Sequence, residues 1–309
     1  MSVLYSSGLH HVLSRYLGHQ VSPEERQVQQ ECAWRLQQWD QLCPDTARAS
    51  VPGCVLGALE GVARGDQGAL TYWRLEGEGV VRKKLRGQGL ETCSALHPLL
   101  TQLRQLGELQ VLGSLEKEEL DRRLPQLQAR DATRAGKFSW LEPVLSLRQA
   151  VVASRPSLAP LLAPLVLHSS RLARRSGAHW VCGQQYRYGL APGPQLRWEE
   201  ALVAWAQGQR DTGIALAKGL LQELEREETP QEQELLPQVL LRLGKWLHHQ
   251  KTETPRTILN NFLTRSVQLL EGGQGQEEAE QLVQAHLALA GFADMQFKHV
   301  SSYSYSCSC

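Results

Sequence analysis

The chain has 309 residues, 42% of them hydrophobic, which is enough for a buried core in two conventional domains or in one continuous array of helices. Its 33 Lys and Arg residues nearly balance its 32 Asp and Glu residues, and the net charge of +1 creates no overall field that would draw the chain to nucleic acid or to an anionic membrane. These values exclude a disordered chain and a strongly basic nucleic-acid-binding domain.

The first half of the chain is predicted to be helical but less regular than the second. Residues 42–58 carry proline and glycine at several positions, and residues 61–89 are rich in glycine, with Trp73 as the main apolar anchor. Residues 79–85 are too charged for a strand. The clearest helix covers residues 96–112, where leucines recur every three or four residues along one face: Leu96, Leu99, Leu100, Leu103 and Leu106.

A helical hairpin is predicted in the second half of the chain. Trp198 and Trp205 lie on one apolar face that ends at Gly208, and residues 214–224 form a second apolar face. The break between the two faces is only about five residues long, so the two helices must fold back on each other. Asp211 is the expected N-cap of the second helix.

The helical pattern continues toward the C-terminus. Residues 235–248 and 258–270 form two more apolar faces, and Thr254 is expected to cap the helix that contains the second. A glycine-rich loop at residues 272–275 separates this helix from a last one that begins at Glu277.

Hairpins of this kind cannot cover their apolar stripes alone, so successive hairpins are expected to stack. The predicted fold is all-α, an α-solenoid of stacked αα-hairpins similar to tetratricopeptide repeats. The predicted organisation is helical repeats over residues 1–152, a proline-rich break at 153–164, further hairpins over 165–300 and a disordered tail at 301–309. Three leucines of the last helix are expected to lack neighbours, which predicts aggregation or self-association: Leu282, Leu287 and Leu289.

No catalytic, cofactor or metal site is predicted from the sequence. The Gly-x-Gly pairs lack the third glycine and the strand-to-helix context of a phosphate-binding loop, and the lysine and aspartates that a protein kinase needs are not found. His248 and His249 have no carboxylate or cysteine at ligand spacing, so we interpret them as a solvated helix end. Cys307 and Cys309 are too close together for a zinc half-site.

Two groups of basic residues are interpreted as solvated helix faces, because no aromatic residues interleave with them: Arg82, Lys83, Lys84 and Arg86, and Arg171, Arg174 and Arg175. Direct binding to nucleic acid or to a membrane is therefore not expected. The seven cysteines are odd in number and mostly far apart, which suits reduced thiols better than disulfides. No apolar run reaches the roughly 18–20 residues of a membrane-spanning helix, and the N-terminus lacks a secretory signal, so the chain is expected in the cytosol or the nucleus.

Eight tryptophans stand out, and we interpret them as packing anchors rather than as a ligand cage, because Trp198 and Trp205 share a face with leucines. Several of them belong to a series of short motifs between residues 9 and 300. No single motif is decisive, but their joint order and spacing are specific. The residues of this series that form the signature are Trp34, Trp39, Asp40, Gly107, Glu108, Glu142, Pro143, Trp205, Gly244, Trp246 and Asp294.

This series resembles the FAT region of the phosphatidylinositol 3-kinase-related protein kinases, most closely in their ataxia-telangiectasia mutated branch. The resemblance implies a non-catalytic scaffold segment of a serine/threonine protein kinase that acts in the response to DNA double-strand breaks. ATP and magnesium would belong to the full-length kinase and not to this segment. The family's FAT helices clasp the kinase domain and contribute to a homodimer, so the implied partners are the chain's own kinase domain and a second protomer. The implied location is the nucleus, with the cytoplasm as an alternative.

Two segments depart from the family pattern. Residues 176–190 do not keep the small residues of the family's helix, and residues 301–309 stand where the family continues toward a kinase domain. The second departure is typical of a truncated product, a splice form or an incomplete gene model.

Two other functions stay open at this point. One is an independent helical-repeat adaptor that binds peptides along a concave face, and the other is a kinase in its own right if the chain is a fragment. A nucleotide-binding measurement on the purified chain separates the scaffold from the kinase.

Overall fold

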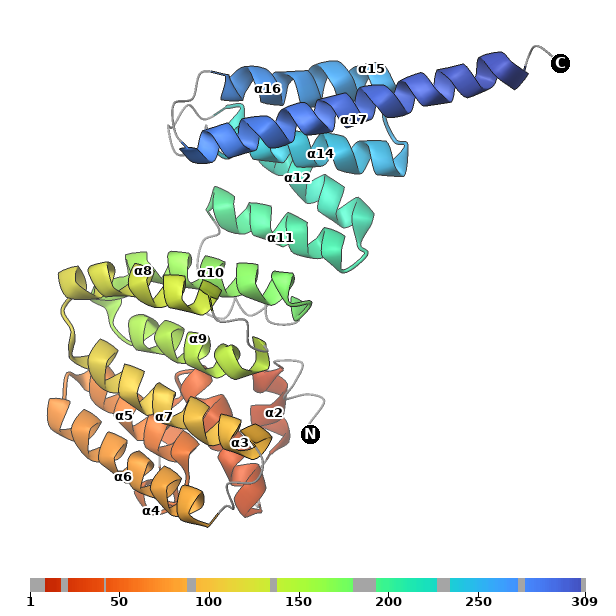
Figure 1. Ribbon diagram of the computed structural model, residues 1–309. Coiled ribbons are helices and arrows are strands. Elements are labelled where there is room, and N and C mark those ends of the chain that lie inside the picture. The colour runs from red at the N-terminus through yellow and green to blue at the C-terminus, as the bar shows by residue number, and fades with distance from the viewer. Residues whose placement is uncertain are drawn as a thin grey trace. The chain divides into compact units, whose positions relative to one another are not determined.

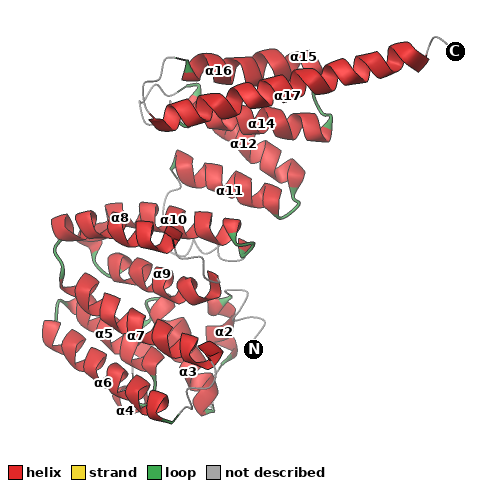
Figure 2. Ribbon diagram, in the orientation of Figure 1, coloured by secondary structure: helices red, strands yellow, loops and turns green. Residues whose placement is uncertain are grey.

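Every regular element in the described part of the chain is a helix (Figure 2). The computed structural model describes residues 9–17, 22–41, 43–87, 93–133, 138–179, 193–226, 234–271 and 276–306. The chain divides into two compact units, Met1–Ala191 and Pro192–Cys309, and in each of them most helices pack on helices that are near them in the sequence. The all-α solenoid predicted from the apolar periodicity is therefore confirmed.

The first unit, coloured red to green in Figure 1, is organised around α5 (Val51–Arg64). Its other elements are α2 (His10–Tyr16), α3 (Pro23–Arg35), η1 (Trp39–Gln41), α4 (Pro44–Ala47), α6 (Gln67–Arg86), α7 (Cys93–Ser114), α8 (Lys117–Thr133), α9 (Phe138–Ala153), η2 (Pro156–Leu161) and α10 (Leu162–Arg175). Most residues of α5 are buried, because this helix packs against α3, α6, α7 and α9. The core of the unit therefore lies between α5 and the helices around it.

Capping residues explain where two of these helices begin. Ser22 and Glu25 form a capping box at the start of α3, and the Ser50 hydroxyl accepts a hydrogen bond from a backbone N–H at the start of α5. Pro52 occupies the first turn of α5, where the missing N–H of proline is not needed. The prolines of residues 42–58 therefore start helices instead of interrupting them, and the less regular structure predicted there is wrong.

Most of residues 61–87 also form regular helix, contrary to the prediction, and two glycines in or beside this stretch lie where helices approach closely. A Cβ atom at Gly77 of α6 would lie 2.9 Å from Leu106 of α7. A Cβ atom at Gly57 of α5 would lie 2.6–2.7 Å from three ring atoms of Trp73, whose buried indole fills the space that the glycine leaves. Gly57 and Gly77 bring α5, α6 and α7 together, so these two glycines mark helix contacts and not a loop.

The proline-rich residues 153–164 form a packed turn within the first unit. The 3₁₀ helix η2 follows α9, leads directly into α10 and contacts both helices. The boundary between the two compact units falls later, between Ala191 and Pro192. The predicted break as a domain boundary stays a prediction, and most of residues 176–190 lie outside the described residues.

The second unit contains α11 (Pro194–Ala206), α12 (Arg210–Leu224), α14 (Leu236–Gln250), α15 (Pro255–Thr257), the π-helical η4 (Ile258–Thr264), α16 (Arg265–Leu270) and α17 (Gln276–Ser306). α15, η4 and α16 follow one another without a break. α11 and α12 form the predicted hairpin, and Gly208 turns the chain between them at a φ of 84°, a conformation that favours glycine.

One of the two caps predicted in this unit is confirmed. The Thr254 hydroxyl accepts a hydrogen bond from the Thr257 N–H at 3.2 Å. Asp211, in contrast, is not the N-cap of α12, because the helix begins at Arg210 after Gln209 and Asp211 lies in its first turn. A carboxylate at that position still interacts favourably with the positive end of the helix dipole, which is why the sequence pattern looks like a cap.

The last helix, α17, packs against α14, η4 and α16. Leu282 and Leu289 contact the apolar core of the unit, so the prediction that they lack neighbours is wrong, whereas Leu287 is 68% exposed as expected. α17 continues to Ser306, through most of the segment predicted as a disordered tail. Despite the length of α17, no described helix is both long and apolar enough to cross a membrane.

Two Gly→Ala variants are expected to shift stability in opposite directions. Gly57→Ala should lower the free energy of unfolding, because an overpacking cost of about 1–3 kcal/mol against Trp73 exceeds the helix-propensity gain of roughly 1 kcal/mol. Gly79→Ala is the matched control on α6, where a Cβ atom meets nothing within 4 Å, and it should raise stability by roughly 0.5–1 kcal/mol. Urea unfolding followed by circular dichroism measures both, and a stabilised Gly57→Ala variant would contradict the close packing.

Candidate functional site: two arginine networks and a tryptophan stack

The signature residues named in the sequence fall into three groups in the structure. Trp34, Glu108, Glu142 and Pro143 lie in contacts between helices of the first unit, and Trp205, Gly244 and Trp246 lie in the core of the second. The third group comprises the residues that lie in neither of these two places: Trp39 is half-buried, and Asp40, Gly107 and Asp294 are exposed. A role for these four residues stays a prediction.

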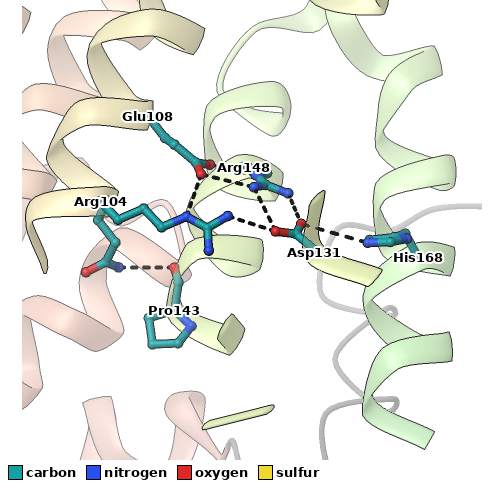
Figure 3. Close-up of polar contacts among 7 residues, drawn as sticks. Arg104, Glu108, Asp131, Pro143, Arg148 and His168 are labelled. Atoms are coloured by element: carbon teal, nitrogen blue, oxygen red, sulfur yellow. Dashed lines mark hydrogen bonds and ion pairs between the residues drawn. The ribbon is translucent and has the colours of Figure 1, made fainter. Parts of the chain in front are cut away.

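Arg148 of α9 lies in a closed ring of ion pairs (Figure 3). Its Nε and Nη2 atoms donate to the two oxygens of Glu108 at 2.7 and 3.0 Å, and its Nη1 atom donates to Asp131 Oδ2 at 2.5 Å. Arg104 closes the ring, with Nε 2.9 Å from Glu108 Oε1 and Nη2 2.8 Å from Asp131 Oδ1. Two positive and two negative charges therefore join α7, α8 and α9.

Most of the ring is buried, and only the Arg104 side chain, at 25%, is exposed to a larger degree, so water screens the other charges little. The side chains of Arg148 and Asp131 are both 0% exposed, and that of Glu108 is 13% exposed. Burial by itself lowers the pKa of Arg148, but the Glu108 and Asp131 carboxylates more than reverse this effect and hold the pKa above its usual value. Because a buried charge is costly unless it is paired, the register of the three helices is tied to these contacts.

His168 of α10 lies at the edge of the ring, with its Nε2 atom 3.9 Å from Asp131 Oδ2. This nitrogen is buried and has no hydrogen-bond partner in the described part of the chain. Burial lowers the pKa of His168, Asp131 opposes this shift, and the positive charges of Arg148, Arg171 and Arg175 add to it. The imidazole is therefore neutral at neutral pH and packs beside the ring without adding a charge.

A second network surrounds Arg35, the last residue of α3. Its Nη1 and Nη2 atoms pair with the two oxygens of Glu142 at 2.5 and 3.0 Å, and its Nε atom pairs with Glu31 at 2.9 Å. The Ser146 hydroxyl accepts from Arg35 at 3.0 Å and donates to Glu142 at 2.6 Å. Burial raises the pKa of Glu142, but Arg35 and Ser146 outweigh burial and hold it below its usual value. The network fastens α3 to α9.

The sequence pattern assigned roles to Glu108 and Glu142 but none to the arginines that neutralise them. A signal for Arg148 is nevertheless present, because this residue interrupts the apolar run of residues 144–152 (VLSLRQAVV). A charge inside a buried run must have a partner, so such an arginine predicts a buried ion pair. The identity of its partners, Glu108 and Asp131, cannot be read from that run.

Three tryptophans of the second unit stack across helices. The Trp205 and Trp246 rings lie 4.6 Å apart at an angle of 6°, and Trp198 lies 5.8 Å from Trp246. Gly244 makes room for η4, since a Cβ atom there would lie 3.0 Å from the Cβ atom of Phe262. The interpretation of tryptophans as packing anchors is confirmed for these residues.

Two other tryptophans of the first unit behave differently from each other. Trp34 of α3 is fully buried, as expected of a packing anchor. Trp140, in contrast, is 37% exposed and stacks on His97 at 3.8 Å. Trp180 lies outside the described residues.

The remaining candidate groups are placed as follows. His248 and His249 contact aromatic rings, Phe292 at 4.9 Å and Trp205 at 5.9 Å, so the solvated helix end that the sequence predicts is only partly correct. Within the described residues, no group of three or more His, Cys, Asp or Glu side chains is arranged to hold a metal ion. Cys307 and Cys309 lie outside those residues.

Removal of the Arg148 guanidinium is expected to destabilise the first unit strongly. In an Arg148→Met variant, Glu108 and Asp131 lose their main partner, and a broken buried ion pair costs about 3–5 kcal/mol. The matched control is Arg122→Met on α8, whose exposed pair with Glu119 contributes at most about 1 kcal/mol. Equal denaturant midpoints for the two variants would show that the ring does not support the fold.

Acidification is expected to lower the stability of the first unit in two steps. The pKa of folded His168 lies below the ordinary 6.5, so the unfolded chain takes up the proton first, and stability present above about pH 6.5 is lost as the pH falls through the folded pKa. The pKa of Glu142 lies below 4.5, so its contribution is present above about pH 4.5 and is lost as the pH falls further.

Urea unfolding measured from about pH 8 to about pH 3 separates the two steps, because His168→Gln should remove the first step and leave the second. A His11→Gln variant, whose imidazole is exposed and outside the network, controls for the loss of a histidine as such. Persistence of the first step in His168→Gln would assign it to another group.

Comparisons with known proteins agree with the resemblance that the signature residues predict. A family model of the FAT domain matches residues 27–304. The serine-protein kinase ATM of Sus scrofa is 25% identical over 346 residues, a match that covers 99% of this chain and 11% of that protein. The chain therefore spans about a ninth of the length of this relative.

Solved structures of CtTel1 share the fold. The structure described as the FAT and kinase domain of CtTel1 matches with a TM-score of 0.76 and 19% identity, over 95% of this chain and 22% of that one. The complete CtTel1 dimer with C2 symmetry matches with a TM-score of 0.76 and 20% identity, over 95% of this chain and 12% of that one. Because the family model covers most of the sequence and the helical architecture agrees with it, the chain belongs to the FAT domain family.

Proposed function

We propose that the chain is a non-catalytic scaffold segment of an ATM-like serine/threonine protein kinase, and that it clasps and regulates the kinase domain in the response to DNA double-strand breaks. The observation that carries this proposal is the family match over residues 27–304, together with the similarity to a serine-protein kinase along 99% of the chain. A solved structure of the same fold is described as a FAT and kinase domain, which supports the kinase domain as the partner. Another is described as a C2 dimer, which supports a second protomer as a further partner.

The arginine networks suggest how such a scaffold acts on its partner. Helices α3, α7, α8 and α9 are joined by ion pairs that are mostly buried. A displacement of one of these helices therefore moves the others with it, instead of changing only the local structure. A rigid body that contacts both lobes of a kinase domain favours the lobe arrangement that fits it. The stability of the scaffold thereby becomes a bias on kinase activity.

The proposed location and pathway rest on kinship alone. A nuclear location and a role in DNA-break signalling follow from the similarity to ATM and not from a feature of the described helices. ATP and magnesium would bind to the kinase domain of the complete protein.

A binding experiment tests the scaffold function. The purified chain is titrated with the separately expressed kinase domain of an ATM-like kinase, and complex formation is followed by calorimetry and gel filtration. We expect a defined complex and a changed rate of peptide phosphorylation, because a scaffold that prefers one lobe arrangement shifts the kinase population. The Arg122→Met variant, altered only at an exposed pair, should behave like the unaltered chain.

Two outcomes would contradict the scaffold. Failure of the chain to bind the kinase domain, combined with binding of extended peptides, would favour the independent helical-repeat adaptor. Micromolar affinity of the chain alone for magnesium ATP would favour a nucleotide-dependent function of its own.

A further inference from the structure

The outer face of α6 is exposed to solvent along most of the helix. α6 packs on α5 and α7 and forms an outer edge of the first unit in Figure 1. On the face away from these two helices, exposed residues recur at alternating spacings of four and three positions: Gly68, Tyr72, Leu75, Gly79, Arg82 and Arg86. We call this row the α6 seam. None of its residues belongs to either arginine network.

The first half of the α6 seam is apolar. Tyr72 is 40% exposed and Leu75 is 52% exposed. The Arg48 guanidinium lies over the Tyr72 ring, 5.8 Å from its centroid, and helps to hold the ring in place. A single exposed apolar residue is common on a protein surface, whereas Tyr72 and Leu75 are neighbours in one row. Alternating spacings of three and four are those by which one helix packs along another, so the row indicates a helix as its occupant.

Gly79 independently indicates a close approach. Glycine in the middle of a helix destabilises it relative to alanine. Gly57 and Gly77 offset this cost through contacts with other helices, whereas a Cβ atom at Gly79 would meet nothing within 4 Å. The packing of the described chain therefore gives no reason for a glycine at this position. A missing side chain beside Leu75 would let the backbone of a second helix come close to α6.

The second half of the α6 seam is basic. Arg82 and Arg86 lie on the seam, Lys83 lies beside it, and all three are exposed. Arg82 shares the Glu78 carboxylate with Arg74, and Lys83 and Arg86 form no ion pair with a described residue. Cations in the last turn also suit the helix dipole, but the dipole does not explain the apolar half of the seam. Charge complementarity requires carboxylates on the occupant at this end.

From this combination we infer that the α6 seam is a docking site for an amphipathic helix of a partner protein, with acidic residues in its first turns and an apolar stripe after them. The partner helix lies antiparallel to α6. Its acidic first turns then meet the basic half of the seam, and its apolar stripe covers the apolar half. Carboxylates in the first turns of a helix also interact favourably with its own dipole, so the same residues stabilise the partner helix and its contacts. This inference does not depend on the clasp around a kinase domain.

A peptide titration tests the occupant. The full chain is titrated with three fluorescein-labelled peptides of about 20 residues, a length that can form a helix in water. The first carries glutamates in its first turns and an apolar stripe at spacings of three and four, the second has glutamine in place of glutamate, and the third carries the glutamates in its last turns. Fluorescence anisotropy should show saturable binding of the first peptide and about threefold to tenfold weaker binding of the other two at low salt. One affinity for all three peptides, or no binding below about 1 mM, would rule out the acidic helix.

Variants of the chain show whether the peptide lies on the seam. Gly79→Ala should weaken binding of the first peptide about tenfold, because the added methyl group keeps the second helix away, although this variant is expected to be more stable. Leu75→Gln should weaken binding to a similar degree. The matched control is Gly219→Ala on α12, another exposed glycine whose Cβ atom would meet nothing within 4 Å, and it should bind like the unaltered chain. Circular dichroism and thermal unfolding confirm that each variant is folded. Unchanged binding by Gly79→Ala would overturn docking on the seam.

A polyanion is the competing occupant of the basic half. A short DNA duplex and vesicles that contain phosphatidylserine are titrated in parallel with the first peptide. The double variant Lys83→Gln, Arg86→Gln should weaken peptide binding about threefold to tenfold at low salt and less at high salt. Tighter binding of DNA or vesicles than of the peptide, lost in the double variant and unchanged in Leu75→Gln, would assign the surface to phosphate contacts instead of a helix.

Discussion

The buried ring of charges around Arg148 is the constraint on which the packing of the first unit depends. Four charged side chains from α7, α8 and α9 come together, three of them largely removed from water, and their charges are paired only while the helices keep their register. An apolar contact tolerates small sliding, because the loss of contact area is gradual. A buried ion pair does not tolerate it, because separation of the charges leaves each of them unsolvated.

The second network extends this constraint to the start of the chain. Arg35 ties α3 to α9, and α9 also carries Arg148, so a single helix is held by charges on two sides. α5 fills the remaining space with apolar side chains and with glycines that allow close approach. The first unit is therefore ordered by polar contacts and filled by apolar ones, which is a combination that specifies one arrangement of its helices.

The second unit uses a different means of order. Its core is apolar, and the stacked rings of Trp205 and Trp246 fix how α11 meets α14. The Gly244 contact with Phe262 lets the π-helical segment lie close to α14. In the second unit, flat stacked rings and closely packed backbones limit the sliding of helices past one another through their shape. In the first unit, the ion pairs limit the same sliding through charge. Each unit is thus built as a stiff body, which is the property that a clasp around a kinase domain would require.

The sequence by itself determined the helical class of the fold, several of its helices and the family to which the chain belongs. The leucines of residues 96–112 lie within α7, the faces around Trp198 and residues 214–224 lie in α11 and α12, and Thr254 caps its helix. These features are local, since spacing and capping are decided by residues a few positions apart. The family was recognised because the order of the motifs is itself a property of the sequence.

Only the tertiary structure decided what the glycines and the charged signature residues do. Gly57 and Gly77 look like loop residues in the sequence, but they lie inside helices, where the missing side chain lets Trp73 and Leu106 of other helices approach closely. Glu108 and Asp131 are Arg148's partners from 40 and 17 positions away. The free energy of burying a charge depends on which groups surround it in space. The order of residues along the chain does not show which distant residues become neighbours after folding.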